Sequence, residues 1–213
     1  MILPERPLSS LLLLVTFFTV CCAAGADNLA AVDHYNRGVE LAYGGQFLPA
    51  LNETDLALRE NQNFTLAYVT RGGILNALGR YNESLDASER AIALNPDQSA
   101  AWNNKAYALI HLERYREGLE AADRATLLDP TLTEAWVNKG TALIALGRYE
   151  EAITVSGQAL LIDSSSEEAK KNRKIAQQAL APVSPTGVPI PPYLIPGALC
   201  LASVVVIVRR RQN

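Results

Sequence analysis

A period of 34 residues runs through the middle of the chain and limits its fold more than any other feature. Trp102 and Trp136 lie 34 residues apart, and Tyr68 lies 34 residues before Trp102. The same step relates three more sets: Phe47, Tyr81, Tyr115 and Tyr149; Leu41, Leu75, Leu109 and Leu143; and Ala57, Ala91, Ala125 and Ala159. The period divides residues 31–166 without insertion into the blocks 31–64, 65–98, 99–132 and 133–166. Self-similarity at a fixed period of roughly 20 to 50 residues indicates stacked supersecondary units.

The apolar pattern of each block predicts two helices. In the fourth block, apolar residues recur at helical spacing from Ala135 to Leu146, and a second apolar stripe runs from Ala152 to Ile162. Small residues, Gly140 and Ala152, allow the paired helices to approach closely. A two-helix unit cannot cover its own apolar face, so the blocks are expected to stack into a solenoid.

The period and these residue types resemble the tetratricopeptide repeat. The resemblance implies an all-α fold, an α-solenoid of four antiparallel helix-turn-helix repeats over 31–166, closed by a C-terminal capping helix over 167–180. Residues 165–168 read as a capping box that opens this last helix. The family's large aromatic residue late in the second helix is replaced here, so a thinner outer layer is expected. The replacing residues are Thr54, Ser88, Ala122 and Ser156.

The N-terminus predicts export from the cytoplasm. Residues 8–20 are free of charge and too short to span a bilayer, and Ala24-Gly25-Ala26 follows them. This order is typical of a secretory signal peptide over 1–26, cleaved before Asp27, with 27–30 as a short lead. An uncleaved anchor and lipidation at Cys21 or Cys22 are the alternatives.

The C-terminus predicts a membrane anchor. Residues 181–192 hold five prolines and read as an extended linker. Residues 190–208 then form one transmembrane helix of about 28 Å, followed by a basic tail over 209–213. The arginines of that tail favour a cytoplasmic C-terminus and an extracytoplasmic repeat region in a single-pass protein of the cell membrane. The order also resembles the sorting tails of prokaryotic, archaeal-type surface proteins. A tail-anchored adaptor with its repeats in the cytosol is the alternative.

Composition argues against several classes of function. Residues 27–181 carry 15 Lys and Arg against 21 Asp and Glu, a poor balance for nucleic-acid binding. All three cysteines, residues 21, 22 and 200, lie outside the repeats, which argues against a disulfide scaffold or a zinc site. His34 and His111 lie two blocks apart. We therefore expect no cofactor, no metal, no small-molecule substrate and no enzymatic activity.

A peptide groove is the candidate site. The sixth position of successive blocks faces the concave side in the tetratricopeptide family, and it reads Asn36, Thr70, Asn104 and Asn138, with Asn172 one step further on. Asparagine carries an amide donor and a carbonyl acceptor, so it can pair with both groups of a peptide backbone. The alternative is that asparagine is common at this position of such repeats and has no role in binding. The candidate groove residues are Asn36, Asn103, Asn104, Tyr107, His111, Val137, Asn138 and Asn172, flanked by Tyr35, Tyr43, Ile110 and Ile144.

The function expected from this reading is a membrane-anchored scaffold that binds a protein or an extended peptide segment. Three sequons give possible glycosylation sites at Asn52, Asn63 and Asn82.

Overall fold

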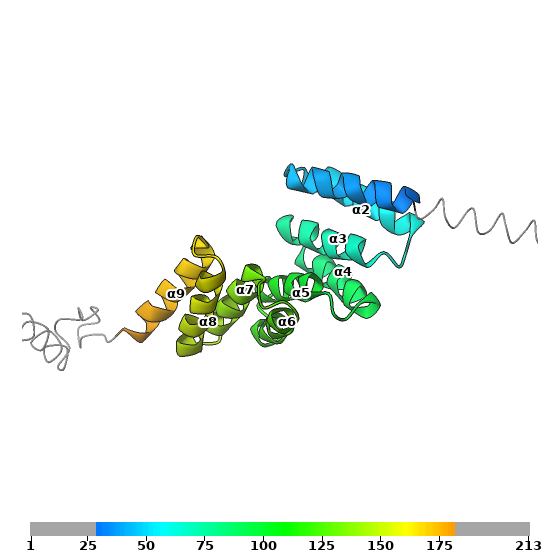
Figure 1. The fold of residues 1–213 in the computed structure, drawn as a ribbon. Coiled ribbons are helices and arrows are strands. Elements are labelled where there is room, and N and C mark those ends of the chain that lie inside the picture. The colour runs from blue at the N-terminus through cyan, green and yellow to red at the C-terminus, as the bar shows by residue number, and fades with distance from the viewer. Residues whose placement is uncertain (1–28, 182–213) are drawn as a thin grey trace, which may run out of the picture.

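The computed structural model describes residues 29–181, and within this range every regular element is a helix. A first helix covers 29–43, and eight more follow in antiparallel order (Figure 1). Their bounds are α2 Phe47–Glu60, α3 Thr65–Ala77, α4 Tyr81–Leu94, α5 Ser99–His111, α6 Tyr115–Leu128, α7 Thr133–Ala145, α8 Tyr149–Ile162 and α9 Glu167–Leu180. The expected α-helical repeat solenoid is confirmed over this part of the chain.

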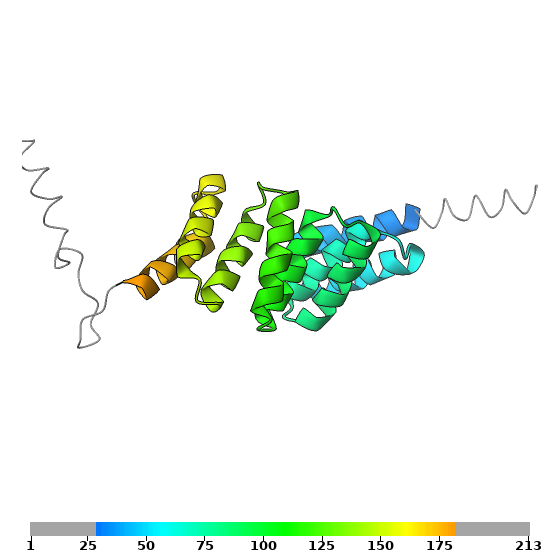
Figure 2. The same cartoon turned by 90° about the horizontal axis from the view of Figure 1, so that it is seen from below.

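The helices form two layers that differ in spacing. The first helices of successive repeats contact one another, through α3 with α5, α5 with α7, and α7 with α9, whereas α2, α4, α6 and α8 make no such mutual contacts. The first-helix layer therefore lies on the inner side of the curve of the stack, and its free surface is called the inner face below. Figures 1 and 2 show the elongated result, with the first helix and α9 at opposite ends.

Leucine and alanine form the core of each repeat. Leu75, Leu109 and Leu143 are among the largest fully buried side chains, and every alanine of the 34-residue series is buried as well. The two tryptophans of the 34-residue period are only half-buried. Trp102 Nε1 donates to the Pro96 carbonyl at 2.8 Å, and Trp136 Nε1 makes the equivalent bond to Pro130 at 2.9 Å. These hydrogen bonds therefore hold the turn between successive repeats against the tryptophan side chains.

The four small residues that replace the family's large aromatic lie between the paired helices. Thr54, Ser88, Ala122 and Ser156 are buried. Opposite Thr54 and Ser156 the first helices carry glycine: a Cβ on Gly38 would lie 3.0 Å from Thr54 Cγ2, and one on Gly140 would lie 3.3 Å from Ser156 Oγ. The small residues thus bring the two helices of a repeat close together, as expected for Gly140, and the thinner outer layer stays a prediction.

The last helix closes the stack. Ala169, Asn172 and Ala176 of α9 are buried, and α9 contacts α7 and α8. Its N-cap is Ser166, whose Oγ accepts from the Ala169 amide at 3.3 Å. Ser165 Oγ donates instead to Asp163 Oδ1 at 2.6 Å. The expected capping box across 165–168 is therefore replaced by a single-sided Ser166 cap.

The predicted membrane elements lie outside the described residues. These are the signal peptide (1–26), the transmembrane helix (190–208) and nearly all of the linker (181–192). Among the helices described, none has the length and apolar character needed to cross a bilayer.

One turn position tests how the repeats tolerate strain. The turn between the paired helices needs a left-handed residue, which is Gly45, Gly79 and Gly147 in three repeats but Glu113, at φ 62°, in the third. A non-glycine residue in this region costs about 1 kcal/mol or more. We predict that Glu113→Gly raises the free energy of unfolding by about 1 kcal/mol, measured by chemical denaturation. Gly147→Ala is the matched control, because a Cβ there meets no atom within 4 Å, and it should lower stability by a similar amount. Unchanged stability in both variants would contradict the strain.

Candidate functional site

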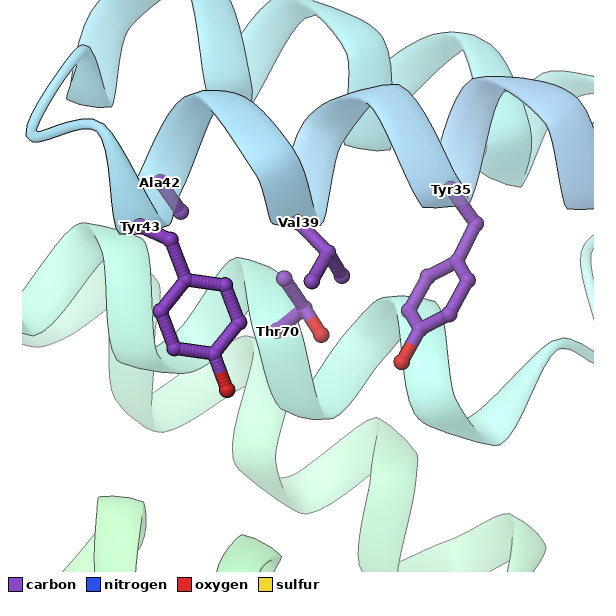
Figure 3. Close-up of a pocket in the computed structure, with 5 residues that line it drawn as sticks. All are labelled: Tyr35, Val39, Ala42, Tyr43 and Thr70. Atoms are coloured by element: carbon purple, nitrogen blue, oxygen red, sulfur yellow. The ribbon is translucent and has the colours of Figure 1, made fainter.

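The inner face is hollowed at its N-terminal end. Tyr35, Val39, Ala42 and Tyr43 of the first helix and Thr70 of α3 line a hollow of about 300 Å³ (Figure 3). The Tyr43 side chain is 91% exposed, so its ring is a free wall rather than part of the core. Both tyrosine hydroxyls and the Thr70 hydroxyl lie on the open side of the helices in Figure 3. The hollow is thus an apolar depression with hydroxyl groups at its rim.

The inner face carries no formal charge at the positions that define this hollow. The 34-residue steps from its four first-helix residues lead to equivalent residues in the other repeats, and none of the sixteen is Asp, Glu, Lys or Arg. The twelve equivalents are Val69, Gly73, Asn76, Ala77, Asn103, Tyr107, Ile110, His111, Val137, Thr141, Ile144 and Ala145. An uncharged strip in a chain with 19% charged residues favours an uncharged ligand, because burying an unpaired ligand charge there is costly.

A second aromatic group lies on this face at the third repeat. The His111 ring stacks on Tyr81 at 4.6 Å between ring centroids and 9° between planes, and its centroid lies 4.4 Å from that of Tyr107. Burial holds the pKa of His111 below its ordinary value and raises the pKa of Tyr107. His111 is therefore part of an aromatic surface, and its neutral form is the favoured one.

The sixth-position asparagines are bonded to the repeat before them. Asn104 Nδ2 donates to the Val69 carbonyl of α3 at 2.8 Å, and Asn172 Nδ2 donates to the Val137 carbonyl of α7 at 3.0 Å. Asn138 Nδ2 donates to Asn103 Oδ1 at 2.8 Å. Asn138 and Asn172 are buried. The structure thus gives these amides hydrogen-bond acceptors within the stack. Fewer of their N–H groups are free to bind a peptide than the sequence predicts.

The other predicted groove residues divide into two sets. Tyr107 and His111 are exposed and lie together, and Val137 is half-buried on the same face. Asn36 is exposed and stands in the first repeat, where no earlier described repeat offers a carbonyl. The residues of the uncharged strip that sequence reasoning missed are mostly small or aliphatic: Val39, Ala42, Val69, Gly73, Asn76, Ala77, Thr141 and Ala145. Their shared signal is the absence of charge at 34-residue steps.

The remaining polar candidates lie elsewhere. Asn52 and Asn82 lie on α2 and α4, Asn63 lies in the turn before α3, and all three are exposed. His34 Nδ1 lies 2.7 Å from Glu53 Oε2, which leaves it in an ion-paired network of the first repeat. In the described range 29–181, no group of three His, Cys, Asp or Glu side chains is placed to hold a metal ion.

These features define the described region as an α-helical repeat solenoid whose inner face is uncharged at the sixteen positions named above. The family profiles described as tetratricopeptide repeat match residues 74–133 and 133–166. Residues 74–166 are therefore tetratricopeptide repeats. The search of curated proteins found no match.

Solved structures share the fold. A thermophilic tetratricopeptide repeat protein of Thermus thermophilus is 20% identical, with a TM-score of 0.63 over 71% of this chain and 83% of that one. MamA from Desulfovibrio magneticus RS-1 is 19% identical, with a TM-score of 0.58 over 70% and 90%. The first such domain of Spaghetti (RPAP3), bound to the HSP90 peptide SRMEEVD, is 24% identical, with a TM-score of 0.52 over 55% and 92%. At these identities the likeness concerns the fold.

The asparagine bonds give a testable stability effect. We predict that Asn104→Ala lowers the free energy of unfolding by about 1 to 2 kcal/mol, because it removes a hydrogen bond between repeats in a half-buried setting. Asn36→Ala is the matched control, since it changes the same repeat position where the side chain is exposed, and it should stay within about 0.5 kcal/mol of wild type. Chemical denaturation measures both. Equal effects in the two variants would show that the bond to Val69 contributes nothing specific.

The His111 cluster gives a dependence on pH. Because the folded pKa is lowered, the unfolded chain binds a proton more readily than the folded chain. Stability is therefore highest above the ordinary histidine pKa of about 6.5 and falls as the pH drops through the folded pKa. We predict that wild type loses more free energy of unfolding than His111→Gln between about pH 7.5 and pH 5. Denaturation curves at both pH values measure this, and an equal loss in the two proteins would remove His111 as the cause.

Proposed function

We propose that this chain is a membrane-anchored interaction module that binds an extended, uncharged peptide segment along the inner face of its repeats. The observation that carries the proposal is the strip of sixteen residues without Asp, Glu, Lys or Arg, hollowed at Tyr35, Val39, Ala42, Tyr43 and Thr70. Concave solenoid surfaces are extended and suit linear ligands. Apolar pockets and hydroxyl groups along such a surface bind alternate side chains and backbone groups of the peptide.

The ligand class differs from that of one structural neighbour. The HSP90 peptide bound by the Spaghetti domain, SRMEEVD, ends in acidic residues. The inner face of this chain offers no Lys or Arg at the sixteen positions to pair with such a tail. An uncharged segment pays no cost of charge burial and is the better match.

The membrane part of the proposal rests on the two ends of the sequence. A signal peptide over 1–26, an apolar segment over 190–208 and the arginines that follow it favour repeats outside the cell membrane and a cytoplasmic C-terminus. The exposed sequons at 52, 63 and 82 are compatible with that side of the membrane. A tail-anchored adaptor with cytosolic repeats is the second candidate, favoured by the same C-terminal segment with a short basic tail.

Site-specific photo-crosslinking tests the binding face. A photoreactive residue at Ala77, on the inner face, should give protein adducts in intact cells that express the full chain, whereas one at Leu127, which is 69% exposed on α6, should not. Ala145 is exposed at the end of α7, so substitutions there leave the core intact. We predict that Ala145→Lys reduces adduct formation at position 77 about tenfold, or roughly 1.4 kcal/mol, and that the uncharged control Ala145→Gln does not. Adducts of equal yield from both faces would contradict the proposal.

Protease access tests the orientation. Protease added to intact cells should cut the repeat region, while a tag placed after Asn213 stays protected, because the basic tail holds the C-terminus in the cytoplasm. Replacing Arg209, Arg210 and Arg211 by glutamine should weaken that orientation. Protected repeats would refute the extracytoplasmic placement and favour the cytosolic adaptor.

A further inference from the structure

We propose that the hollow at Tyr35 and Tyr43 receives the proline-rich segment 182–189 of a second copy of this chain, so that copies associate head to tail. The inference rests on the proposed function, because it names the ligand of the same face. Three observations carry it: the chemistry of the segment, the donors around the hollow and the reach of the chain.

The segment matches the charge and shape of the hollow. Residues 182–189, PVSPTGVP, contain three prolines and no charged residue. Proline-rich segments bind in an extended polyproline II form, with little conformational entropy left to lose, and dock in grooves lined by aromatic rings. The hollow is walled by Tyr35 and Tyr43 with Val39 between them (Figure 3). Uncharged, ring-shaped side chains therefore meet an uncharged, aromatic surface.

The hydrogen-bonding groups are complementary as well. Three of the eight residues in the segment are prolines, which lack an N–H but keep a carbonyl acceptor. Such a ligand needs donors from its partner. The rim of the hollow offers the hydroxyls of Tyr35, Tyr43 and Thr70, which can donate to those carbonyls. The amides that would suit an ordinary peptide, those of Asn104 and Asn138, already donate within the stack.

The reach of the chain selects a second copy over the segment's own repeats. The segment follows α9, at the opposite end of the stack from the first helix (Figures 1 and 2). Four steps separate these helices in the first-helix layer, or roughly 36 Å at about 9 Å per step. Eight residues in the polyproline II form span about 25 Å. The segment therefore cannot reach its own hollow, whereas a neighbouring copy faces no such limit.

An association of this kind is heterologous, since the hollow of one copy takes the segment of the next. Heterologous contacts generate rings or open chains rather than closed two-fold dimers. An open assembly would keep one free hollow in the copy at one end and one free segment in the copy at the other end. Two defective variants with complementary lesions should therefore restore one contact when they are mixed.

The test uses the full chain in a mild detergent and two variants. The segment variant replaces Pro182, Pro185 and Pro189 by serine and keeps the hollow. The hollow variant, Tyr43→Ala, keeps the segment and changes a side chain that is 91% exposed, so the core is untouched. Leu127→Ala, which also changes an exposed side chain, is the control. Sedimentation should show concentration-dependent assembly for wild type and Leu127→Ala, monomers for each lesion variant alone, and a one-to-one heterodimer when the two variants are mixed.

A labelled peptide of residues 181–189 provides the second measurement. Fluorescence anisotropy should show it binding to the segment variant, whose hollow is unoccupied, and roughly tenfold more weakly to the same variant carrying Tyr43→Ala. Assembly that survives Tyr43→Ala, or a mixture that yields no heterodimer, would overturn the inference. If the peptide fails to bind while position 77 still forms adducts with another protein, the inference fails and the proposed function stands. If no adducts form on the inner face either, both fail.

Discussion

Register between successive repeats depends on a side-chain amide that reaches back one repeat. The bonds from Asn104 to Val69, from Asn138 to Asn103 and from Asn172 to Val137 all span 35 residues, so the same pair of positions is joined at each of the last three junctions of the stack. The acceptor is the backbone carbonyl of Val69 and of Val137, and the side-chain oxygen of Asn103. Each joins first helices, the layer whose members touch one another. Because the bond is short and partly or fully removed from water, a slip of one turn between helices would leave a buried polar group unpaired. The inner face is therefore assembled in one register, and its uncharged strip is continuous.

Ion pairs reinforce the same junctions without setting their register. Asp55 with Arg71, Glu89 with Lys105, and Asp123 with Lys139 pair the second helix of one repeat with the first helix of the next, each at 2.8 Å. Partly exposed pairs of this kind contribute little individually. At the last junction the acidic position is Gly157 and the basic one is Arg173. There Asn172 makes an additional bond to Thr141 Oγ1 at 3.0 Å, so the closing helix gains a second amide contact where the ion pair is missing.

Periodicity predicted the fold well because it reports on burial, and burial decides which residues face a neighbouring helix. The series Leu75, Leu109 and Leu143 could be placed in the core from spacing alone. Spacing says which side of a helix a residue is on, but not how far its side chain reaches or what it meets there. Hence the asparagines were placed on the inner side while their bonds to the preceding helix were missed. The narrow gap that Ser88 fills was missed for the same reason, since only the close approach of Gly72, where a Cβ would lie 3.1 Å from Ser88 Oγ, reveals it.

Using the asparagines for register has a consequence for recognition. An inner face whose amides are free could bind the backbone of almost any extended peptide. When those amides donate within the stack, less of the binding can come from backbone pairing, and more must come from apolar contact with the tyrosines, Val39 and Ile144. Apolar contact alone discriminates weakly among similar side chains. The strong discrimination is against charge, because each unpaired charged residue carried onto the strip loses its hydration without gaining a partner. The asparagine amides are used between repeats, and the strip beside them is uncharged. The inner face therefore selects its ligands chiefly by excluding charged ones.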